Sequence, residues 1–125
     1  MQSEYVLSNL RELNALIADL YVKVTDINYA VANGKRAPKA DIDGARGTIA
    51  KLNWKLIETQ AILGGRDTKT LPEFQKSVRG VSQALDGRLD LAGCQQLLKK
   101  VNAMAFDGAL VIQSVGRHVS LSADA

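Results

Sequence analysis

The sequence holds few side chains of the types that perform chemistry, and their spacing assigns them no reaction. The single histidine, His118, follows Arg117, and the single cysteine is Cys94. His118 could act as a general base because imidazole titrates near neutral pH. No nucleophile or orienting carboxylate can be assigned to it, so a cationic pair near a helix C-terminus, where the helix dipole favours positive charge, is the better interpretation.

The acidic residues give no pattern for a metal site. One histidine and one cysteine cannot supply the ligand set of a structural zinc site. Asp41 and Asp43 are two residues apart, so on a helix their side chains point in different directions. Glu58 and Glu73 fall on different helices without the Glu-x-x-His partner of a di-iron bundle site. We therefore expect no enzyme activity, no metal and no cofactor, and we interpret Cys94 as a small core residue.

Composition is typical of an ordinary globular protein. The chain has 125 residues, 46% of them hydrophobic and 23% charged, which predicts one folded domain over residues 1–125. The lone cysteine excludes an internal disulfide framework and favours a reducing compartment. We see no signal peptide and no uncharged apolar run long enough to span a bilayer, so we expect a cytoplasmic protein with no membrane partner.

Apolar periodicity predicts four helices, over about residues 3–32, 39–63, 71–85 and 91–120. In each, apolar residues recur at alternating steps of three and four, which places them on one helix face. Short connections between them favour an all-α fold, an antiparallel up-down four-helix bundle with three long helices and a shorter helix 71–85. The expected core seams are Val6, Leu10, Leu13, Ile17, Leu20, Val24, Ile27 and Val31; Ile42, Ala45, Ile49, Leu52, Leu56, Thr59 and Leu63; Leu71, Phe74, Val78, Val81 and Leu85; and Leu91, Cys94, Leu98, Val101, Ala105, Gly108, Ile112, Val115 and Val119, the last widened by Leu97, Met104 and Val111.

Helix boundaries are marked by residues that favour caps. Asn33-Gly34 and Gly64-Gly65 can adopt the left-handed conformation that ends a helix. Thr70-Leu71-Pro72-Glu73 has the pattern of a capping box with Thr70 as the N-cap. Asp90 is the expected N-cap of the last helix.

The predicted helix over residues 39–63 is apolar on two sides. Opposite its core seam runs a second stripe centred on Trp54, which lies roughly 200° from Leu52 at the helical angular step. A helix that is apolar on two sides is covered on two sides in the folded protein. The stripe consists of Gly47, Ala50, Trp54, Ile57 and Ala61.

The middle of the predicted helix 91–120 is apolar nearly all round, which indicates deeper burial than a lone bundle gives. Self-association would cover the apolar surfaces of both helices, because a second copy of the chain supplies the covering residues. The alternative is that these two helices pack centrally within one subunit. We expect the former, and hence a non-enzymatic helical assembly or adaptor module that contacts itself or another protein. The expected interface residues are Trp54, Ile57, Ala61, Phe106 and Leu110.

Positive charge is concentrated over residues 33–82, within a formal net charge of +3. An up-down bundle brings its first and third loops to the same end, so cations from both should gather there. Such a surface could follow a phosphate backbone without reading sequence. The second hypothesis is therefore a small basic subunit of a nucleoprotein complex, analogous in size, charge and fold to the small helical subunits of CRISPR effector complexes. Its contact residues would be Lys35, Arg36, Lys39, Lys51, Lys55 and Arg88.

Overall fold

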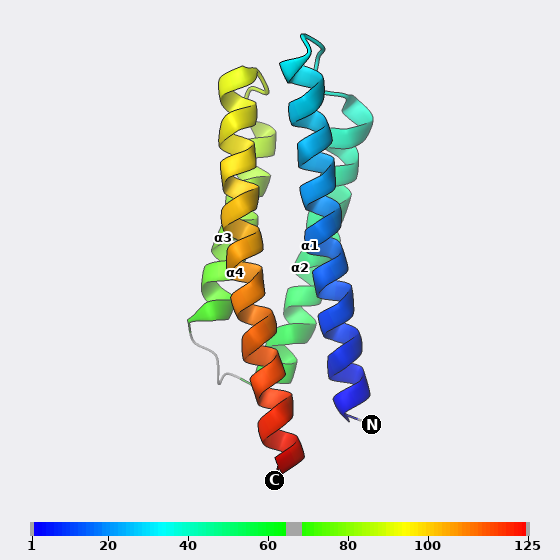
Figure 1. The fold of residues 1–125 in the computed structure, drawn as a ribbon, viewed down its shortest axis with the longest axis vertical. Helices are drawn as coiled ribbons and strands as arrows, with labels where there is room; N and C mark the ends of the chain where they lie inside the picture. Colours follow the sequence, from blue (N-terminus) through cyan, green and yellow to red (C-terminus); the bar gives the residue numbers. More distant parts are fainter. Residues whose placement is uncertain (1, 65–68, 125) are drawn as a thin grey trace.

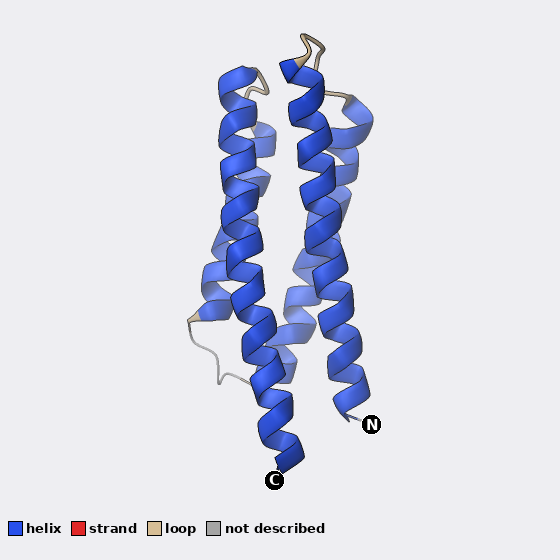
Figure 2. Cartoon of the chain, in the orientation of Figure 1, coloured by secondary structure: helices blue, strands red, loops and turns tan. Residues whose placement is uncertain are grey.

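The protein is a bundle of four antiparallel helices (Figures 1 and 2). The computed structural model describes residues 2–64 and 69–124, with side chains over 4–64 and 69–117, and no strand occurs in these ranges. The predicted all-α up-down bundle is confirmed, with the third helix the shortest. The helices are α1 (Gln2–Ala32), α2 (Lys39–Leu63), α3 (Thr70–Asp86) and α4 (Leu91–Asp124).

The helices form a square in which each packs against two neighbours. Helix α1 contacts α2 and α4, and α3 contacts α4 and, less extensively, α2. Helices α2 and α4 lie on one diagonal and contact each other little, and α1 and α3 lie on the other. Loops 33–38 and 87–90 lie together at one end, and α1 begins and α4 ends at the other (Figure 1). Helix α3 begins short of that second end, where the bundle consists of α1, α2 and α4 alone (Figure 1).

Most predicted seam residues of α1, α2 and α3 form the buried core, and all five of α3 are buried. Leu10 of α1 and Ile42 of α2 are only half-buried, at the edges of their faces. Two polar residues that the apolar pattern omitted, Asn9 and Thr48, are buried instead. Alternating steps of three and four therefore located these three core faces correctly to within a residue.

The predicted seam of α4 was wrong by one residue at several turns. Leu91 is exposed at the start of the helix, and Leu98, Ala105 and Ile112 are half-buried at the edge of the core face. Each of these last three follows an apolar residue that is completely buried, so periodicity alone could not choose between the two. The observed seam is Cys94, Leu97, Val101, Met104, Gly108, Val111 and Val115. It includes all three residues of the predicted neighbouring row, Leu97, Met104 and Val111, whereas the side chain of Val119 lies outside the described residues.

The structure describes a residue of each of the four predicted caps. Gly34 and Gly64 adopt positive φ angles of 78° and 58°, as expected of residues that end α1 and α2. The Asp90 carboxylate accepts a hydrogen bond of 2.8 Å from the Gly93 N–H, which confirms it as the cap of α4. The predicted Thr70 cap was wrong, because Thr70 is already helical and Lys69 is the N-cap. Gly65 lies outside the described residues.

No helix within residues 2–64 and 69–124 combines the length and the apolar character that a membrane span needs.

Helix α4 approaches α1 and α3 closely at Gly108. A Cβ atom at this position would lie 2.6 Å from Cδ1 of Ile17 and 3.1 Å from Cε1 of Phe74. Both of those side chains are buried in the core, so a Cβ at position 108 would require them to repack. The absence of a side chain at Gly108 therefore sets how closely α4 approaches its neighbours.

Gly108→Ala should destabilise the protein, although alanine is the better helix former by about 1 kcal/mol. Overpacking against Ile17 and Phe74 costs about 1–3 kcal/mol and outweighs that gain. Gly116→Ala in the same helix is the matched control, because a Cβ there meets nothing within 4 Å. Urea unfolding should show a lower free energy of unfolding for Gly108→Ala and an equal or higher one for Gly116→Ala. Equal stabilisation by both substitutions would contradict the tight crossing.

Candidate functional site

The outward face of α2 is an apolar stripe that no part of the protomer covers among the described residues. Trp54 is 72% exposed and Ile57 is 59% exposed, although Leu52 and Leu56 on the opposite side of the same helix are buried. The stripe continues through exposed small residues at both ends. We define the outward face as Gly47, Ala50, Trp54, Ile57, Ala61 and Gly64, which follow one another at steps of three and four.

A first set of polar contacts fixes the rotation of α2 against α1. The Asp19 carboxylate accepts hydrogen bonds from Lys23 Nζ and from the buried Thr48 hydroxyl, each 2.6 Å long. Lys23 Nζ also lies 2.9 Å from the Thr48 oxygen. The hydrogen bond from Lys23, and then that from Thr48, holds the pKa of Asp19 below its ordinary value. Thr48 is thereby kept on the inner side of α2, with the outward face turned away.

A second set of polar contacts places Lys55 in the interface between α1 and α2. Its side chain is only 13% exposed, and its ammonium donates hydrogen bonds to Glu12 of α1 and, at 2.8 Å, to Glu58 of α2. Burial alone would lower the pKa of Lys55, but the hydrogen bonds with Glu12 and Glu58 raise it above its ordinary value. The hydrogen bond with Lys55 lowers the pKa of Glu12. Lys55 is therefore a residue of the helix interface.

A third contact lies nearer the end of the bundle that α3 does not reach. The buried Asn9 Oδ1 accepts a 3.2 Å hydrogen bond from the hydroxyl of buried Thr59. The Asn9 Nδ2 is buried and has no hydrogen-bond partner among the described residues. An unsatisfied buried donor of this kind costs about 1–3 kcal/mol. Such polar pairs can fix helix register at the expense of stability.

A shallow hollow of about 420 Å³ adjoins Trp54 on the side of α2 that faces α1. Ala15 and Leu16 of α1 contribute its apolar wall, and the charged groups of Lys51 and Glu58 stand on the α2 side. The hollow therefore extends the apolar surface around Trp54 beyond α2 itself. It offers a partner an apolar recess bordered by two lysines and two glutamates.

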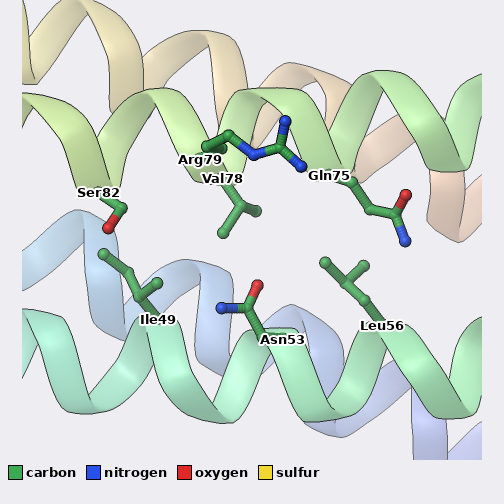
Figure 3. Close-up of a pocket in the computed structure, with 7 residues that line it drawn as sticks. All are labelled: Ile49, Asn53, Leu56, Gln75, Val78, Arg79 and Ser82. Atoms are coloured by element: carbon green, nitrogen blue, oxygen red, sulfur yellow. The ribbon is translucent and has the colours of Figure 1, made fainter.

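A cleft of about 380 Å³ lies on the other side of α2, where α2 and α3 pack less extensively (Figure 3). Its floor is formed by Ile49 and Leu56 from α2 and Val78 from α3. Asn53 projects between the two helices, and the polar side chains of Gln75, Arg79 and Ser82 line the α3 side (Figure 3). None of these lining residues is acidic or a histidine, so the cleft holds no general base that could activate the Ser82 hydroxyl.

The five predicted interface residues do not form one surface. Trp54, Ile57 and Ala61 are exposed on the outward face of α2. Phe106 is 68% exposed on the outer side of α4, and Leu110 beside it is half-buried. Because α2 and α4 are diagonal helices, these two groups face opposite directions. The exposure of Phe106 also shows that the middle of α4 is not covered all round within one subunit.

The six predicted nucleic-acid contacts are likewise divided. Lys35, Arg36, Lys39 and Arg88 lie at the end of the bundle where loops 33–38 and 87–90 meet (Figure 1). Acidic groups accompany them there. Lys35 shares a hollow of about 610 Å³ with Asp26 and Asp41, and Arg88 Nε lies 3.6 Å from an oxygen of Asp90. Lys51 stands apart, along the middle of α2, and Lys55 is the interface residue described above.

The candidate catalytic and metal-binding residues form no site in the part of the chain that the structure describes. The side chain of His118 lies outside it. Cys94 is buried in the core, and burial raises the pKa of its thiol, which disfavours the reactive thiolate. No group of three or more His, Cys, Asp or Glu side chains over the described residues could hold a metal ion.

Comparisons with protein-family models, with curated proteins and with solved structures find no match to this chain. Among the surfaces described above, the outward face of α2 is the longest apolar one. It lies on a helix whose rotation is fixed by contacts with α1.

Asp19→Asn should destabilise the fold at pH 7 by less than about 1 kcal/mol, because the carboxylate is partly exposed. A carboxyl whose pKa is lowered on folding stabilises the native state above its unfolded pKa, about 4, and this contribution is lost as the pH falls through the folded pKa. Chemical unfolding of both proteins should therefore show a difference at pH 7 that shrinks below about pH 4. A difference that does not vary with pH would contradict the assigned role of Asp19.

Proposed function

We propose that this chain is a non-enzymatic assembly or adaptor module that acts through protein–protein contacts and associates with itself through the outward face of α2. The observation that supports this most strongly is the exposure of Trp54 in the middle of a continuous apolar stripe. Tryptophan is among the residues most enriched where interfaces bind most tightly, and contiguous exposed apolar surface marks interaction sites.

The contacts between α1 and α2 support the same proposal. They hold α2 so that Trp54 and Ile57 point outward, and they do so without drawing on either side chain. A face that is already held in place loses little further freedom when a partner binds, which favours affinity. The pair Phe106 and Leu110 on α4 is the weaker candidate interface, because only Phe106 of these two side chains is large, apolar and exposed.

The nucleic-acid hypothesis receives less support. Of its six residues, Lys55 is nearly buried and bonded to two carboxylates, and Arg88 has Asp90 beside it. Lys35 shares its hollow with two further carboxylates. Binding to a phosphate backbone depends on uncompensated positive charge, and these neighbours reduce it.

Light-scattering mass after gel filtration should give a multimer for the natural chain and a lower mass for Trp54→Ala. Loss of a central aromatic contact worth 2 kcal/mol or more corresponds to roughly a 30-fold weaker association. Phe106→Ala is the matched control, because Phe106 is nearly as exposed on the opposite helix, and it should leave the mass unchanged. Circular dichroism would establish that both variants are folded.

A monomeric mass for the natural chain throughout the micromolar range would contradict the proposed self-association. An unchanged multimer for folded Trp54→Ala would show that another surface is used. Absorbance at 260 nm in excess of that of the protein, removed by moderate salt, would favour the nucleic-acid hypothesis instead.

A further inference from the structure

The outward face of α2 is symmetric in residue size about its own centre. Trp54 and Ile57 occupy the middle, Ala50 and Ala61 flank them, and a glycine stands at each end. The steps of three and four between these residues are those of a helix seam that packs against a second helix. Reversing the direction of α2 therefore reproduces the same order of small and large residues.

The polar residues beside the outward face have the same symmetry. On the side of α1 stand Lys51 and Glu58, of opposite charge, and on the side of α3 stand Asn53 and Gln60, both amides. All four are at least partly exposed, the Glu58 side chain by 44%. Flanking positions of this kind set the choice and the orientation of a partner helix.

From this symmetry, and resting on the proposed self-association, we infer that the partner is a second copy of this chain, with α2 packed antiparallel on α2 across a two-fold axis that crosses the helix between Lys55 and Leu56. Each contact then occurs twice, as an isologous interface requires. Trp54 packs on Ile57 of the second copy, and Ala50 packs on Ala61. Lys51 faces Glu58 on one flank, and Asn53 faces Gln60 on the other.

A parallel pairing of the same two faces is unfavourable. It would set each Trp54 against its own copy, and the flanking positions would bring Arg46 of one chain toward Lys51 of the other. Like charges at such positions repel each other. Arg46 is already paired with Asp86 of α3 within its own protomer, at 3.0 Å. The antiparallel arrangement leaves that pair intact and places Lys51 opposite the Glu58 carboxylate, which also accepts a hydrogen bond from Lys55 of its own protomer.

Disulfide cross-linking distinguishes the two orientations. Ala50→Cys and Ala61→Cys are both substitutions of exposed residues, and the one natural cysteine is buried. An equimolar mixture of the two variants, equilibrated under reduction and then oxidised, should give a covalent dimer on a non-reducing gel. Neither variant should give one alone, because the axis places the two copies of residue 50 about 16 Å apart along the helix, beyond the reach of a disulfide.

Charge exchange supplies an independent readout. Lys51→Glu should weaken dimerisation by roughly tenfold, because a carboxylate then faces Glu58 of the second copy on both sides of the axis. Adding Glu58→Lys should restore most of the affinity. Circular dichroism of each variant keeps a loss of folding separate from a loss of dimerisation.

Three results would overturn the inference and can be told apart. A covalent dimer of Ala50→Cys alone would show a different orientation or register, and the proposed self-association would stand. A multimer by light scattering that gives no covalent dimer in the mixture would reject this pairing while also leaving the self-association in place. A monomer by light scattering would reject the proposed self-association together with the inference.

Discussion

Helix α2 carries apolar side chains on two opposite faces, and one four-helix bundle can bury only one of them. The inner face contains Leu52 and Leu56, which are buried, and the outer face contains Trp54, which is 72% exposed. Turning the helix to bury Trp54 would expose that inner face and break the contacts of Thr48 and Lys55 with α1. Burial of the inner face therefore leaves the outer face exposed and available to a partner.

The neighbours of α2 explain why its second apolar face stays exposed. Helix α3 is short and contacts α2 less extensively than it contacts α4, so a cleft lined by Asn53 and Arg79 opens between α2 and α3. On the other side, α1 holds α2 partly by polar contacts. Helix α4 differs, because the close approach at Gly108 packs it against Ile17 of α1 and Phe74 of α3.

Much of the fold could be predicted from the sequence, because periodicity reports which face of a helix is buried. It could not choose between Leu97 and Leu98 in α4, since both are apolar and adjacent. It also omitted Asn9, whose burial depends on Thr59 of another helix. The exposure of Trp54 agreed with its position opposite Leu52. The burial of Lys55 could not be foreseen, because its partner Glu12 is distant in the sequence and only the packing of α1 on α2 brings them together.

The most direct measurement is the fluorescence emission of Trp54 as a function of protein concentration, because it is the only tryptophan in the chain. If the outward face of α2 is covered by self-association, the emission should move from the long wavelength of an exposed indole toward a shorter wavelength as concentration rises. The shift should occur over the range in which the mass increases. Emission that stays at the long wavelength while the mass increases would contradict the assignment of this face as the interface.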